Sequence, residues 1–204
     1  LLAWRSSTQY GQIMYAIAIA SIVKRLVNFG IYEPLVAELG AANCNKKKAK
    51  IIGSVNVFKL TILTITLLGL FLFTQQRAMN NDQTLIILLI SLGFGLEIVC
   101  ESVLADLRVR SEQNEEGRVK RLAYFVSYSF GLVAVLAGFR PAIVASYKLI
   151  CAFIILSETN KIFFQRYACL PYDYSSMSQI WSMLRIAGTV AVVHLLGIIY
   201  NKIH

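Results

Sequence analysis

Two adjacent basic residues, Lys24 and Arg25, stand inside an apolar stretch that is long enough to cross a membrane. The stretch covers residues 12–39, and at about 1.5 Å rise per residue a helix of that length exceeds the roughly 30 Å of hydrocarbon in a bilayer. Charges placed there normally face a water-filled cavity or a partner. The pair therefore predicts a site for an anionic group, which Arg binds with a planar fork and Lys as a point charge. The alternative is a shorter helix whose cations reach an interface.

Two carboxylates lie inside another apolar run, residues 84–107. Glu97 and Glu101 are four residues apart, so they share one face of a helix. Such a pair is a candidate to carry a proton or to hold a cation such as Na⁺. Glu97 lies about 20 Å along its helix, close to the expected depth of Arg25. A structural salt bridge between Glu97 and Arg25, or a pair that only lines a cavity, is the alternative.

Two further lysines stand well inside apolar runs, Lys59 in residues 51–73 and Lys148 in residues 142–164. Several cations that converge on one cavity favour a polyanionic substrate such as a diphosphate. We therefore place Lys59 with Lys24 and Arg25 among the predicted substrate-binding residues. Lys148 follows Pro141 by only seven residues, so the alternative for it is a side chain that extends to the nearby membrane surface.

The composition predicts the elements that position these residues. The chain has 204 residues, of which 57% are hydrophobic and 15% charged, whereas an average soluble domain has roughly 45–50% apolar and 25% charged residues. This predicts an all-α, polytopic membrane bundle. The apolar segments are residues 1–4, 12–39, 51–73, 84–107, 122–139, 142–164 and 186–203.

The basic loops predict the orientation of the bundle. Basic residues gather in residues 46–50, 108–121 and 161–166, which alternate with loops that are poor in basic residues. This alternation is typical of a multi-pass protein of the cytoplasmic membrane with these loops inside. It also accounts for the net charge of +9 without nucleic acid, which we do not expect as a partner. Residues 169–185 predict an amphipathic interfacial helix, with apolar residues at Met177, Ile180, Trp181 and Leu184.

Enzymatic motifs are not apparent in the sequence. Cys44, Cys100, Cys151 and Cys169 have no metal-binding spacing, and no nucleotide-binding Gly-rich loop or Ser/His/Asp set is present. We therefore expect a transport protein without a metal or cofactor, and not an enzyme. The chain begins without Met and ends within an apolar run, so we expect a fragment of a longer protein.

The order of these features resembles that of a known family. The stretches RSSTQYGQIMYAIAI, LVNFGIYEPLVAELG with its following basic loop, CLPYDYSSMSQIWSMLRIAG and IIYNKIH resemble polysaccharide flippases of the multidrug, oligosaccharidyl-lipid and polysaccharide exporter superfamily. KRLVNFGIYEPLVAELG is also similar to the lipid II flippase branch. His204 stands where the family usually has an acidic residue, and Ala37 where it often has a basic one.

The resemblance implies the first lobe of a two-lobed, MATE-like transporter. Residues 1–168 would form the six-helix N-terminal lobe, residues 169–185 the amphipathic linker and residues 186–204 the start of helix seven. The partners would be the bilayer, the missing C-terminal lobe and a lipid-linked sugar diphosphate of the O-antigen type, moved by alternating access. Lys24 and Arg25 would then hold the phosphate, and the carboxylates of the fourth run would couple the cycle to H⁺ or Na⁺.

Three other functions stay open on the sequence. A cation-coupled multidrug exporter of the same superfamily would favour an acidic, aromatic cavity. An integral membrane transferase acting on a lipid-linked sugar would need clustered acidic metal ligands, but Asp82, Asp106 and Asp173 lie far apart in the sequence. In a membrane scaffold, neutralising Arg25 would change only stability.

Overall fold

The computed structural model describes residues 7–77, 79–173, 180–185 and 187–188. Five helical segments in this part of the chain are long and apolar enough to cross a membrane, the first of them made of α1 and α2 together. They correspond to the five predicted segments between residues 12 and 164, which confirms the predicted helices and is consistent with a multi-pass membrane protein. The helices are α1 Ser7–Asn28, α2 Tyr32–Ala41, α3 Asn45–Gln76, α4 Asn81–Val109, α5 Gln113–Leu136 and α6 Pro141–Tyr167.

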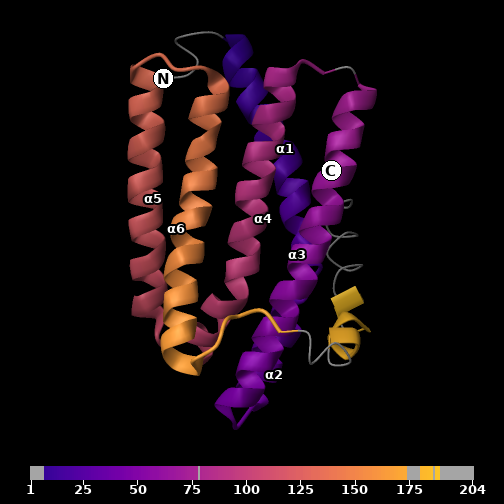
Figure 1. Ribbon diagram of the computed structural model, residues 1–204, viewed down its shortest axis with the longest axis vertical. Helices are drawn as coiled ribbons and strands as arrows, with labels where there is room; N and C mark the ends of the chain where they lie inside the picture. Colours follow the sequence, from indigo (N-terminus) through magenta and orange to yellow (C-terminus); the bar gives the residue numbers. More distant parts are fainter. Residues whose placement is uncertain (1–6, 78, 174–179, 186, 189–204) are drawn as a thin grey trace, which may run out of the picture.

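Helix α4 is the centre of the bundle. The long helices run side by side along the long axis of the molecule, with α4 between the α5–α6 pair and α3 (Figure 1). In the most apolar 18-residue stretch of α4, 61% is buried inside the bundle, against 22–39% in the corresponding stretches of the other spans. Two glycines permit the close packing: a Cβ on Gly95 would lie 2.2 Å from Leu63 Cδ1 of α3, and one on Gly93 would lie 2.9 Å from the backbone of Lys148 of α6.

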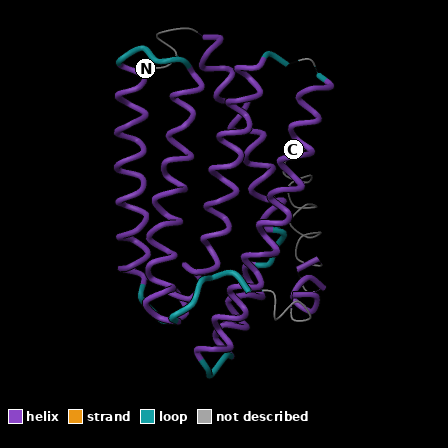
Figure 2. The backbone as a smooth tube through the Cα atoms, in the orientation of Figure 1, coloured by secondary structure: helices purple, strands orange, loops and turns teal. Residues whose placement is uncertain are grey.

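The connections between the long helices gather at the two ends of the bundle, whereas the short α1–α2 connection lies between the ends (Figure 2). The α3–α4 and α5–α6 turns lie at one end, together with the start of α1; the α2–α3 and α4–α5 turns and the end of α6 lie at the other (Figure 1). The three basic segments predicted to face the cytoplasm all belong to the second end. We call this the inner end and the opposite one the outer end, because basic loops mark the cytoplasmic side of membrane proteins.

The sequence predicts one helix over residues 12–39 that is only thinned or kinked at Gly30 and Pro34, but the structure has a full break there. Helix α1 ends at Asn28, and α2 begins at Tyr32. Between them Phe29 has φ 41° and Gly30 has φ 69°, and this left-handed backbone cannot continue a right-handed helix. Lys24 and Arg25 consequently lie near the C-terminal end of α1, with Arg25 in its last turn, and not in the middle of a helix.

The predicted amphipathic helix is described only in part. Residues 180–185 are helical, with Ile180 and Met183 buried and Leu184 half-buried, whereas Trp181, predicted on the same apolar face as Ile180, is exposed. The predicted segment of residues 1–4 and nearly all of the segment of residues 186–203 lie outside the described residues. The chain after α6 packs on α3, where the Asn56 side chain donates a hydrogen bond to the Pro171 carbonyl at 3.0 Å.

Candidate functional site

An ion pair joins α4 to α6 inside the bundle. The Nζ atom of Lys148 donates a hydrogen bond to Oε1 of Glu97 at 2.6 Å. The two side chains are only 8% and 13% exposed. The same Nζ atom lies 4.1 Å from the centre of the Phe94 ring and 6.0 Å from that of Tyr124, so aromatic faces supply further attraction for the cation.

The Lys148 side chain points away from the nearer membrane surface. Its backbone lies against Gly93, where an added Cβ would approach the Lys148 carbonyl carbon and oxygen to 2.9 Å. Glu97 lies one turn beyond Gly93 toward the inner end, whereas the outer end of α6 is only seven residues from Lys148. The alternative of a lysine that extends to the outer surface is therefore wrong, because the partner of the ammonium lies in the other direction.

Lys59 forms a second buried contact with α4. Its side chain is fully buried, and Nζ donates hydrogen bonds to the Ile98 carbonyl and to Ser102 Oγ, each at 3.0 Å. Glu101 lies near enough to act electrostatically on this ammonium, although no direct hydrogen bond joins them. The close contact of Gly95 with Leu63, one turn along α3, holds the lysine against α4.

The two predicted carboxylates thus have cations from different helices. Glu97 pairs with Lys148 of α6, and Glu101 lies in the field of Lys59 of α3. The repulsion expected between carboxylates four residues apart is offset by these two ammonium groups. The alternative of a salt bridge between Glu97 and Arg25 is wrong, since Glu97 bonds to Lys148. A charge pair buried between packed helices can couple helix movement to the binding of a proton or a cation.

Lys24 and Arg25 lie apart from this buried cluster. Both side chains are exposed on the surface of α1, while the neighbouring Val23 and Val27 are buried with Leu63 and Ile98 in one apolar cluster. The structure therefore brings Lys59 and Lys148 to α4 but leaves Lys24 and Arg25 on the exposed side of α1. Neither has a carboxylate partner within the described residues. The C-terminal end of a helix favours cations, which agrees with their position on α1.

Three tyrosines of α5 and α6 lie next to the buried cluster, and of these Tyr128 is exposed. The rings of Tyr124 and Tyr128 stack with centres 5.7 Å apart, and Tyr128 contacts Tyr147 of α6 at 5.9 Å. From the sequence we expect Tyr124 and Tyr128 to serve in packing or in the aromatic belt at the membrane surface, and Lys148 is not expected as a partner of Glu97. A lysine in the middle of an apolar run of α6 was the available signal, because such a residue needs a counter-charge from another helix.

A polar network closes the inner end of the bundle. Arg110, just after α4, bonds to Asp106 at 3.1 Å, to Asn45 of α3 at 3.0 Å and to the Tyr167 hydroxyl of α6 at 3.0 Å. Burial disfavours the cation, but the contacts with Tyr167 and Asp106 outweigh it and raise the pKa of Arg110. One arginine therefore ties three helices together at this end.

A second inner-end arginine reaches two more helices. Arg108 bonds to Glu116 of α5 and to the hydroxyl of Tyr32 of α2. Glu116 in turn accepts a hydrogen bond from Lys120 at 2.6 Å. These contacts anchor α2, which follows the break in the first span, to the inner ends of α4 and α5.

No protein-family model, curated protein or solved structure matches this chain. In the described part of the chain, no group of three or more His, Cys, Asp or Glu side chains is placed to hold a metal ion.

Proposed function

We propose that this chain is part of a membrane transporter that moves an amphipathic anion, such as a lipid-linked sugar diphosphate, across the cytoplasmic membrane. In this proposal the chain forms the N-terminal lobe of a MATE-like flippase, and a second lobe completes the path. The resemblance of the sequence to polysaccharide flippases supports the proposal, as does a multi-pass helical bundle whose first span is broken. Broken helices near charged groups are common where transporters bind ions and substrates.

The observation that carries the proposal is the contrast between two kinds of cation. Lys59 and Lys148 are buried and matched by groups on α4. Lys24 and Arg25 are exposed on α1, level with the buried cluster of Val23, Val27 and Ile98. Ile98 lies nine residues before Leu107, or about 14 Å inside the inner end of the apolar part of α4. Two exposed cations at this depth favour an anionic partner, because their contact with lipid alone is costly.

In this mechanism Lys24 and Arg25 hold the diphosphate while the lipid tail stays in the bilayer. The Glu97–Lys148 pair and Glu101 reset the lobe by exchanging their ion pairing for a proton or Na⁺. A cation-coupled multidrug exporter is the second candidate, favoured by the aromatic rings of Phe94 and Tyr124 beside Glu97. Lys148 already forms an ion pair with the Glu97 carboxylate, so a cationic drug would have to displace the lysine.

The test replaces Lys24 and Arg25 together by Ala in the full-length parent protein and measures export of lipid-linked glycan in cells. The matched control replaces Arg118 and Arg121, a second exposed basic pair near the inner end. We expect loss of export at normal membrane abundance for the first variant and normal export for the control. Unchanged export in the first variant contradicts the proposal, and resistance to cationic dyes that depends on Glu97 would favour the multidrug exporter.

A further inference from the structure

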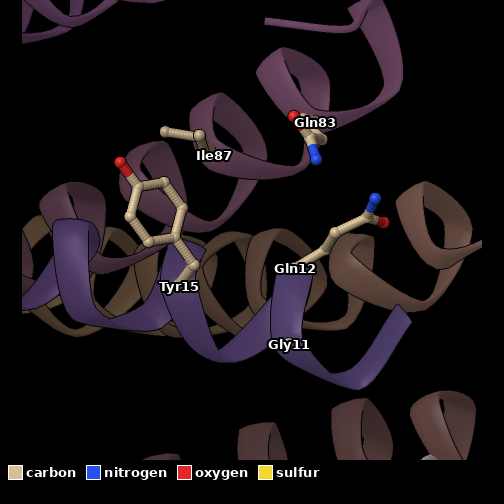
Figure 3. Close-up of a pocket in the computed structure, with 5 residues that line it drawn as sticks. All are labelled: Gly11, Gln12, Tyr15, Gln83 and Ile87. Carbon is tan, nitrogen blue, oxygen red and sulfur yellow. The ribbon is translucent and has the colours of Figure 1, made fainter. Parts of the chain in front are cut away.

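A pocket of about 290 Å³ lies toward the outer end of the bundle, between the early turns of α1 and α4. Its lining consists of Gly11, Gln12 and Tyr15 of α1 and Gln83 and Ile87 of α4. Figure 3 shows the carboxamides of Gln12 and Gln83 pointing toward one another, with the Tyr15 ring and Ile87 beside them. Gly11 leaves the mouth open, since a Cβ there would have no neighbour within 4 Å.

The lining is polar but uncharged. Gln12 and Gln83 are half-buried, and their carboxamides form no hydrogen bond with another described residue. Each carboxamide offers two N–H donors and a carbonyl acceptor, the combination that matches a hydroxyl group, which both donates and accepts. Without a cation in the lining, the pocket offers no counter-charge to a phosphate.

The remaining walls are apolar and suit a flat ring. Tyr15 is 48% exposed, so one face of its phenol ring is accessible, and Ile87 is 1% exposed and forms a closed floor. A sugar ring has hydroxyl groups along its edges and C–H groups on its faces. The two carboxamides match the edge, and the aromatic and aliphatic side chains match the face. The volume lies just below the roughly 300–1,000 Å³ usual for ligand sites, which favours a single ring.

We propose that this pocket binds a neutral sugar ring of a membrane-embedded glycolipid at the outer end of the bundle. The identification of that ring with the glycan of a transported, lipid-linked substrate rests on the proposed function. Lys24 lies nine residues after Tyr15, about 14 Å further along α1 toward the inner end. The sugar pocket and the cationic pair are therefore separate sites on one helix, and they can be tested independently.

The experiment places the full-length protein in phosphatidylcholine nanodiscs that contain either monogalactosyl diacylglycerol or phosphatidylglycerol. Native mass spectrometry measures which lipid stays bound. The variant carries Gln12→Leu and Gln83→Leu, which keep side-chain size and remove hydrogen bonding. The matched control carries Gln75→Leu and Gln76→Leu, two exposed glutamines at the outer end of α3. Equal thermal midpoints for both variants and the wild type confirm folding.

We expect the wild type and the control to retain the galactolipid and the Gln12/Gln83 variant to bind it about tenfold more weakly, as the loss of two hydrogen bonds implies. Equal retention by the wild type and that variant overturns the proposal. Equal loss of both lipids also overturns it, since the pocket would then bind any hydroxylated headgroup. Because glycan export is not measured, a negative result here leaves the test of Lys24 and Arg25 unaffected, and a negative export result leaves this one unaffected.

Discussion

Replacing Lys148 by Met leaves the Glu97 carboxylate without its partner inside the bundle. The Nζ–Oε1 distance is 2.6 Å, so at an effective dielectric constant near 20 the attraction is about 6 kcal/mol. Desolvation of both groups offsets much of this attraction in the native protein. When one partner is removed, the carboxylate keeps its desolvation cost without compensation, and the expected loss of stability is about 3–5 kcal/mol.

The double variant Glu97→Gln, Lys148→Met tests the same argument in the opposite direction. Both charges are then gone, the side chains keep their size, and the helices still pack around Gly93. We expect this variant to be close to the wild type in stability, because replacing a buried pair by neutral groups of similar volume is often neutral or favourable. The double variant should therefore recover most of the stability that the single variant Lys148→Met loses.

The assay is thermal unfolding of the full-length protein in detergent, followed for the wild type, both single variants and the double variant. At about 2–4 °C per kcal/mol for a chain of this size, Lys148→Met should lower the midpoint by about 6–20 °C. A single variant as stable as the wild type would refute the reasoning, and so would a double variant as unstable as Lys148→Met.

Three further predictions concern helix packing, the second lysine and the orientation of the chain. Gly93→Ala should lower the free energy of unfolding by about 1–3 kcal/mol, because the new Cβ would lie 2.9 Å from the backbone of Lys148. The control is Gly69→Ala, where the new Cβ has open space around it. Equal thermal midpoints for the two variants would contradict the close packing at Gly93. Lys59→Met should cost less than about 2 kcal/mol by the same assay, since no carboxylate bonds directly to its ammonium; a loss as large as that of Lys148→Met would contradict this. Backbone N–H groups of the residues that begin α3 lower the pKa of the exposed Cys44 thiol, so a larger fraction of it is thiolate at pH 7. An impermeant maleimide should therefore label Cys44 rapidly in inverted vesicles and not in right-side-out vesicles. The reverse labelling pattern would contradict the predicted orientation.

The sequence was sufficient to predict the four long helices α3 to α6. Each of the apolar runs 51–73, 84–107, 122–139 and 142–164 lies almost entirely within one of the helices α3 to α6. A run of 18 or more apolar residues in a membrane has few alternatives to a helix, because every backbone polar group must be satisfied within the segment. The basic loops lie at one end, as the predicted alternation requires, because each long helix runs from one end of the bundle to the other (Figure 1).

The break in the first span was predicted only as a kink. Gly30 and Pro34 indicated a weak point, but apolar composition continues through residue 39. The helix ends because Phe29 as well as Gly30 adopts positive φ, and composition does not report the conformation of one non-glycine residue. Pro34 causes no disruption, since it lies in the first turn of α2, where its missing N–H is not needed.

The partners of the buried charges could not be predicted from one sequence. Glu97 and Glu101 share a helix face by spacing alone, but their cations come from α6 and α3. Which helix faces which depends on the rotation of each helix about its axis, and this is set by close contacts such as that of Gly93 with Lys148. Because helix rotation is not encoded in residue spacing, the sequence could not show that Lys24 and Arg25 lie on the exposed side of α1 while Lys59 is buried.

The most direct test of the central claim is export of lipid-linked glycan by the full-length protein carrying Lys24→Ala and Arg25→Ala. The account predicts loss of export with normal membrane abundance, and normal export when Arg118 and Arg121 are replaced instead. Normal export in the first variant would contradict the claim that this exposed pair on α1 binds an anionic substrate.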